Sequence, residues 1–76
     1  MKDSLSISLI TSSADYSNSS VVYSTPKNDS SDEEKVRRLA IEFLFNAKRE
    51  YNEHVRVEVW LNRENGISQL IFEKEK

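Results

Sequence analysis

The dipeptide Asn65-Gly66 stands between two segments in which apolar and polar residues alternate, and no other feature constrains the fold as strongly. The alternation over residues 55–61 and 67–73 is typical of β-strands that bury one face. Asn and Gly both tolerate the positive φ angles of a type I′ turn, which joins two antiparallel strands tightly. The sequence therefore predicts a hairpin with strands at about residues 55–61 and 67–73.

A turn centred on this dipeptide also predicts the register of the hairpin. The expected cross-strand pairs are Leu61 with Leu70, Val59 with Phe72, Trp60 with Ile71, and Glu58 with Glu73. The first two pairs share one face of the sheet, and the pair of Trp60 and Ile71 lies on the other face. The register fits the apolar pattern, although the two facing glutamates carry a mild like-charge penalty.

The first part of the chain is rich in serine and predicts two further strands. Apolar residues alternate with serines over residues 4–11, which is the pattern of a strand with one apolar face. Residues 12–20 are predicted to form a polar loop. The β-forming residues that follow predict a short strand at about residues 21–25, and Pro26 ends it because proline cannot donate to a ladder.

One helix is predicted over residues 32–52. Ser31 and Glu34 have the spacing of a capping box, in which the serine hydroxyl accepts from an amide three residues on and the glutamate reaches back. Lys48 and Arg49 would then lie near the C-terminal end of the helix, where positive charge is favourable.

These elements predict an α+β fold with the order β-β-α-β-β. We expect a single small domain, over residues 1–76, with a mostly antiparallel four-stranded sheet and one helix packed across one face. The predicted core consists of Leu5, Ile7, Leu9, Val36, Leu39, Ala40, Phe43, Leu44, Ala47, Tyr51, Val57, Val59, Leu61, Leu70 and Phe72. The strand order between the two hairpins stays open.

The chain has 76 residues and no cysteine, which limits how it can be stabilised. A domain of this size buries only about 60% of the surface that its unfolded chain exposes. Without cysteine there is neither a disulfide framework nor a zinc–thiolate site, and a single histidine cannot build a histidine-rich metal site. We expect no metal and no cofactor, so close packing, self-association or a partner must supply the stability.

Charge and hydropathy argue against several classes of protein. The net charge of −2 is nearly balanced, which does not favour wholesale binding to nucleic acid or to an anionic membrane. No apolar segment approaches the about 20 residues that span a bilayer, and the first residues lack the continuous apolar segment of a signal peptide. We therefore expect a cytoplasmic protein without a membrane partner.

The sequence offers few residues that could carry catalysis. It has no cysteine nucleophile, and His54 stands alone between the helix and the following strand. Gly66 is the only glycine, so a glycine-rich phosphate-binding loop is excluded. We expect no enzymatic activity.

Ile41 and Phe45 fall outside the apolar stripe of the predicted helix and lie one turn apart. Arg38, Lys48 and Arg49 surround them. An aromatic–aliphatic pair with a cationic rim is typical of a protein interface. Three interpretations stay open: the serine-rich segment of the same chain covers this face, a second copy covers it, or a foreign partner binds it.

The face of the sheet opposite the helix is a second candidate surface, because it is predicted to carry Trp60 and Ile71. Coverage by a terminal segment or a simple cross-strand pair would explain these residues within one chain. A dimer or partner surface is the alternative.

The sequence therefore predicts a small non-enzymatic protein-interaction module. It would act as an adaptor, a regulatory subunit or a stoichiometric inhibitor, such as those encoded by viruses or mobile elements, by covering a surface of a larger protein. Two alternatives stay open. One is a nucleic-acid-binding protein that uses the basic face of the helix, and the other is a homodimeric structural module.

Overall fold

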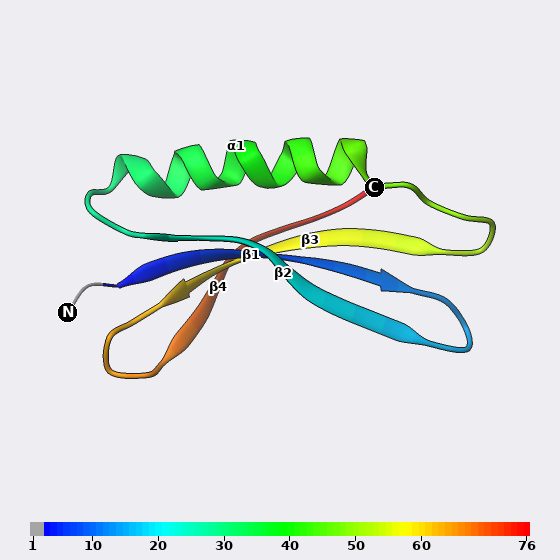
Figure 1. Ribbon diagram of the computed structural model, residues 1–76, viewed down its shortest axis with the longest axis horizontal. Helices are drawn as coiled ribbons and strands as arrows, with labels where there is room; N and C mark the ends of the chain where they lie inside the picture. Colours follow the sequence, from blue (N-terminus) through cyan, green and yellow to red (C-terminus); the bar gives the residue numbers. More distant parts are fainter. Residues whose placement is uncertain (1–2) are drawn as a thin grey trace.

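The computed structural model describes residues 3–76 and contains one four-stranded antiparallel sheet with a single helix across one face (Figure 1). The elements are β1 (Ser4–Ser12), β2 (Ser17–Pro26), α1 (Ser31–Asn46), β3 (His54–Asn62) and β4 (Ser68–Glu75). The strand order is β2-β1-β3-β4, so the two hairpins join through their first strands. This confirms the predicted fold and adds the strand order.

The core lies between α1 and the two central strands. The pairing of β1 with β3 sets Leu5 opposite Leu61 and Ile7 opposite Val59, so the apolar side chains of both strands share one face. The buried core cluster consists of Leu5, Ile7, Val36, Ala40, Leu44, Val55, Val57, Val59 and Leu61. Its helical members are spaced four residues apart, as expected for one stripe of a helix.

Two residues of the predicted core are exposed instead. Tyr51 is 93% exposed because the helix ends before it, and Leu70 is 39% exposed because it lies on the open face of the sheet. Three residues outside the prediction are buried: Val55 on the helix side, and Ser8 and Ile10, which pair with Glu58 and Arg56 on the open side.

The predicted capping box of α1 is wrong. The N-cap residue is Ser30, and its side chain makes no capping hydrogen bond. The hydroxyl and the amide of Ser31 both donate to the carboxylate of Asp29. The Asp32 carboxylate accepts from the amides of Asn28 and Asp29, at 2.7 and 3.1 Å. Carboxylates replace the serine hydroxyl here because charged acceptors form the stronger hydrogen bonds.

The helix also ends earlier than predicted, at Asn46. Ala47 has an extended backbone, with φ −70° and ψ 134°. Lys48 and Arg49 therefore lie in the connection to β3 and not on the helix. Helices in proteins gain most of their stability from an apolar face that packs, and residues 48–50 have no apolar side chain to extend that face.

The connection to β3 contains a tight turn at residues 50–53. The amide of Glu53 donates to the carbonyl of Glu50 at 3.1 Å, and Asn52 has a φ of 66°. A positive φ at the third position of a turn is tolerated by asparagine. The turn directs the chain back along the sheet into β3.

The hairpin of β3 and β4 is present, but its turn differs from the predicted type I′. The amide of Arg63 donates to the carbonyl of Ile67 at 2.8 Å, and the amide of Gly66 donates to the carbonyl of Arg63 at 3.0 Å. Of Asn65 and Gly66, only Gly66 has a positive φ, of 91°. The loop over residues 64–66 is therefore of the kind in which a turn is followed by a left-handed glycine.

A β-bulge at Ile71 accounts for the rest of the register. Trp60 pairs with Leu70 and Leu61 with Gln69, so the predicted pairs of Trp60 with Ile71 and Leu61 with Leu70 are wrong. The register shifts between Val59 and Trp60, and beyond this point the predicted pairs of Val59 with Phe72 and Glu58 with Glu73 are present. The extra residue of the bulge offsets the longer loop.

Strand β2 begins at Ser17, within the segment predicted to be a loop. It pairs with β1 along its whole length, with a second register shift at Val22. Backbone hydrogen bonds to β1 form the strand, because most of its side chains are exposed and contribute little burial.

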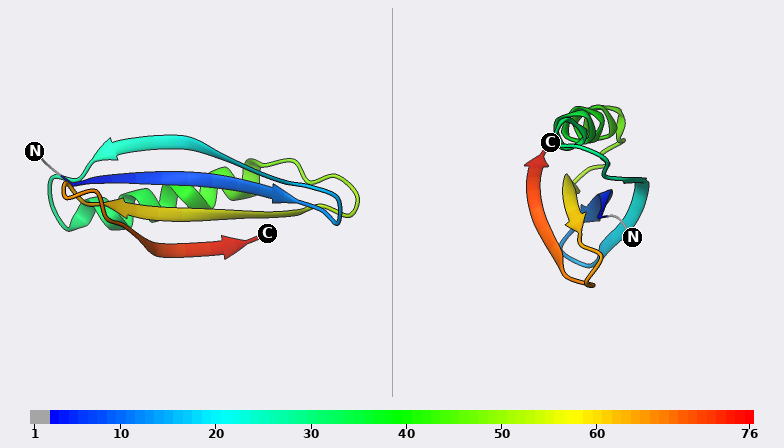
Figure 2. Two further views of the ribbon diagram at one scale, coloured as in Figure 1. Left: turned by 90° about the horizontal axis from the view of Figure 1, so that it is seen from below. Right: turned by 90° about the vertical axis from the view of Figure 1, so that its left-hand side faces the viewer.

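The helix does not cover the sheet evenly. It contacts β1, β3 and β4 but not β2, and the left view of Figure 2 shows it behind the two central strands. The molecule measures 42 × 22 × 15 Å. The loop of the first hairpin and the α1–β3 connection lie at the same end of this elongated shape (Figure 2).

Candidate interaction surfaces

Phe45 lies in the last turn of α1 and is 66% exposed. Its neighbour Leu44 is buried in the core, so the two adjacent residues point to different sides of the helix. Ile41, one turn earlier, is half-buried. Within residues 3–76 the serine-rich segment does not cover Phe45.

The cations predicted around Phe45 have different environments. Arg38 forms an ion pair with Glu34, one helical turn away, at 2.8 Å. Lys48 and Arg49 are exposed in the connection that follows the helix. We call Arg38, Ile41, Phe45, Lys48 and Arg49 the helix-end surface. Arg38 lies in the middle of α1, Ile41 and Phe45 lie in its second half, and Lys48 and Arg49 follow the helix.

Lys76 adds a cation to this region that the sequence did not indicate. Its Nζ donates to the carbonyl oxygens of Ala47 and Phe45, at 2.6 and 3.0 Å. The last turn of α1 has no basic residue of its own, so Lys76 supplies the positive charge that stabilises a helix C-terminus. No sequence signal pointed to Lys76, because the predicted helix already had Lys48 and Arg49 at its C-terminal end.

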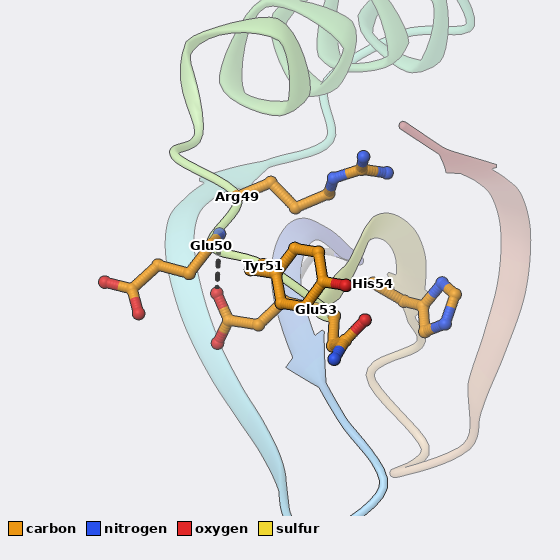
Figure 3. A pocket seen from close by; sticks show the side chains of 6 residues that line it. Arg49, Glu50, Tyr51, Glu53 and His54 are labelled. Carbon is orange, nitrogen blue, oxygen red and sulfur yellow. Dashed lines mark hydrogen bonds between the residues drawn. The ribbon is translucent and has the colours of Figure 1, made fainter.

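The α1–β3 connection lines a shallow groove beside the helix-end surface. Figure 3 shows the side chains of Arg49, Glu50, Tyr51, Glu53 and His54 around it. The amide of Glu50 donates to the Glu53 carboxylate at 2.9 Å, which ties the two ends of the turn together. This turn leaves Tyr51 almost fully in solvent.

An adjoining groove lies between the α1–β3 connection and the loop that joins β1 to β2. Tyr16, on this loop, is 42% exposed, and it lines the groove together with Tyr51. Two tyrosines from different connections thus lie at one end of the molecule. Sequence reasoning missed this arrangement because it placed Tyr51 on a longer helix.

The chemistry of this groove is that of a polar surface. His54 begins β3 and is exposed, and it pairs with Ser12 of β1. No group of three or more histidine, aspartate and glutamate side chains that could hold a metal ion occurs in the described part of the chain.

On the open face of the sheet, Trp60 is half-buried and hydrogen-bonded. Its indole Nε1 donates to one oxygen of Glu58 at 3.2 Å, and Nε of Arg56 donates to the other at 3.3 Å. Leu70 lies opposite Trp60 on β4. Ile71, predicted on this face, instead packs against the core cluster. The predicted pair is therefore replaced by Trp60 and Leu70.

The two candidate surfaces lie on opposite sides of the sheet, because α1 covers one face and Trp60 lies on the other. A single flat partner surface could not contact both. The fold and these surfaces define a small α+β domain with an exposed aromatic residue at its helix end. Among residues 3–76, no helix has the length and apolar character needed to cross a membrane.

Comparison of the chain with protein-family models, with curated proteins and with solved structures finds no match.

Proposed function

We propose that this chain is a small, non-enzymatic protein-binding module that acts by covering a surface of a larger protein. The helix-end surface is its contact site, with Phe45 as the central residue. The observation that carries the proposal is the 66% exposure of a phenylalanine in the last turn of a packed helix. Buried aromatic residues dominate the binding energy of many interfaces.

The support for Phe45 includes its rigid setting. Leu44, the preceding residue, is buried in the core, and the carbonyl of Phe45 accepts a hydrogen bond from Lys76. A side chain on such a backbone loses little conformational freedom on binding, which favours affinity. A phenylalanine that enters an apolar pocket of a partner would also remove its own exposed ring from water.

The charges around Phe45 favour a partner with an acidic patch. Lys48 and Arg49, three and four residues after it in the chain, are exposed. Such charges accelerate association with a surface of opposite sign and select against basic partners. The expected mode of action is steric: the bound domain occupies a site that another molecule would use. An adaptor, a regulatory subunit and a stoichiometric inhibitor all act in this way.

Nucleic-acid binding through the helix receives less support. That hypothesis requires a basic stripe along one helix face, but Lys48 and Arg49 lie beyond the helix end. Arg38 is paired with Glu34, and the Arg37 guanidinium lies 6.0 Å from the ring centroid of Phe72. An interrupted row of cations gives weak attraction to a phosphate backbone.

Site-specific photo-crosslinking in the cell that makes the protein tests the proposal. A benzophenone amino acid replaces Phe45 in one variant and Ile67 in the control variant. Ile67 is a suitable control because it is 61% exposed on the distant β3–β4 turn. We expect an adduct with one protein species from position 45 and none from position 67.

The same partner then permits a quantitative measurement. Phe45→Ala should weaken binding by about 2 kcal/mol or more, the range of interface hot spots, and Ile67→Ala should leave it unchanged. Identical adducts from positions 45 and 67, or no adduct from position 45, would contradict the proposal.

A further inference from the structure

Strand β2 is an edge strand whose Pro26 and bulge at Val22 leave its first five residues, 17–21, with little protection. It runs over ten residues, of which only Val22 and Thr25 are not exposed. Its sequence contains no lysine, arginine, aspartate or glutamate. The helix does not contact it. Proteins usually shield a long edge strand with charges or with a covering element, because its backbone can pair with another chain.

The hydrogen bonds of the first hairpin show which backbone groups of β2 face its open edge. The amide of Ser13 donates to the carbonyl of Tyr16 at 2.8 Å, so these two residues form a hydrogen-bonded pair. Such pairs alternate along an antiparallel ladder. Asn18 and Ser20 therefore direct their backbone groups towards β1.

The intervening residues Ser17, Ser19 and Val21 direct their amides and carbonyls to the open edge. The row stops there because the bulge at Val22 shifts the alternation by one residue. The side chains of Ser17 and Ser19 are small, and all three side chains are exposed. The edge thus presents a short, uncharged row of backbone donors and acceptors.

We infer that two copies of this chain pair through β2 in antiparallel orientation, about a twofold axis at Ser19. In this register Ser19 meets Ser19 of the second copy, and Ser17 meets Val21. Every outward amide then finds a carbonyl, and no charged pair is formed. The two sheets become one continuous sheet, in which both helices lie on the same face.

The other edge of the sheet is less suited to self-pairing. The amide of Lys76 donates to the carbonyl of Val55 at 2.9 Å. By the same alternation, the backbone amides and carbonyls of Glu73 and Glu75 face the open edge of β4. Two β4 strands that paired antiparallel would bring these acids together, which is unfavourable. Because β2 carries no charge and the edge of β4 carries two glutamates, pairing between two copies is more favourable through β2.

A second copy also fits β2 better than a foreign peptide does. Recognition of a foreign strand requires pockets or charges that select its side chains. The row from Ser17 to Val21 offers only hydroxyls and one valine. A symmetric partner needs no such selection because it presents the same row in the same register. This inference uses a different strand from the proposed function and stands independently of it.

Charge complementation at Ser19 tests the inference, with sedimentation equilibrium as the readout. The wild-type chain should form a dimer. Ser19→Lys and Ser19→Glu, each alone, should raise the dissociation constant about fivefold or more, because like charges meet across the axis. An equimolar mixture of the two variants should form a heterodimer at least as tight as the wild-type dimer.

The control variant is Gln69→Lys, which introduces the same charge at an exposed position on the other edge strand. It should leave the dimer unchanged, and circular dichroism should show that all variants are folded. A wild-type chain that stays monomeric up to about 1 mM overturns the inference. So does a dimer that Ser19→Lys does not weaken, or a mixture of the two charge variants that does not associate.

Discussion

The ammonium group of Lys76 donates a hydrogen bond to the carbonyl oxygen of Ala47 over 2.6 Å. This contact joins the residue after β4 to the end of α1, at opposite ends of the second half of the chain (Figure 1). It supplies positive charge to a helix C-terminus whose last turn has none. The contact also holds the backbone of the helix-end surface in place.

Lys76→Met should therefore lower the free energy of unfolding by about 0.3–1 kcal/mol, because methionine keeps an apolar stem and removes the charge and the donor. Urea denaturation at low ionic strength measures this loss. Lys74→Met is the control, since it removes the same charge from an exposed residue of β4. Equal effects of the two substitutions, at low and at high salt, would mean that the helix end does not depend on Lys76.

The neighbours Leu44 and Phe45 should respond in opposite ways to truncation. Leu44→Ala should cost about 2–5 kcal/mol, because it opens a cavity in the core, whereas Phe45→Ala should change stability by about 0.5 kcal/mol or less. Thermal unfolding followed by circular dichroism measures both. A domain of this size has a reserve of only about 3–5 kcal/mol, so the Leu44 variant should be partly unfolded at room temperature. A large loss of stability in Phe45→Ala would show that the Phe45 side chain packs in the core.

The apolar pattern of the sequence was sufficient to predict the four strands, the helix and the side of the helix that packs. The helical period alone places Leu44 and Phe45 on different sides of the helix, and their exposure agrees. The pattern could not show where α1 ends, because Tyr51 continues its period although the helix stops at Asn46.

The register of the second hairpin shows a different limit. The predicted turn is one residue shorter than the observed one, and the bulge at Ile71 restores the pairing of Val59 with Phe72. Both registers bury the same valine, so the apolar pattern does not distinguish them. The contact of Lys76 with α1 could not be predicted, because it depends on the complete sheet.

The pH dependence of stability should report on Asp29. The hydrogen bonds from the side chain and then the backbone of Ser31 lower the pKa of the Asp29 carboxyl from its ordinary value of 3.8. A carboxyl whose pKa is lower in the folded state stabilises the fold above the unfolded value, and this stability is lost as the pH falls through the folded value. Asp29→Asn should therefore lower the melting temperature at pH 7 more than at pH values below the folded pKa.

A matched pair of serine variants tests the cause of this shift. Ser31→Ala removes the hydroxyl that donates to Asp29, whereas Ser30→Ala removes a hydroxyl that makes no capping hydrogen bond. The pKa of Asp29, measured by NMR titration of the carboxyl carbon, should rise towards 3.8 in the first variant. It should stay unchanged in the second. A rise in both, or in neither, would show that Ser31 is not the main donor.

A substitution on the open face of the sheet should not affect binding through the helix-end surface, because the sheet lies between the two surfaces. Trp60→Phe removes the indole donor to Glu58 but keeps an aromatic ring opposite Leu70. It should cost about 1 kcal/mol of stability, the net value of one hydrogen bond. Affinity for the partner captured at position 45, measured by titration calorimetry, should not change. Loss of that affinity in Trp60→Phe, with Phe45→Ala unaffected, would move the binding site to the open face of the sheet.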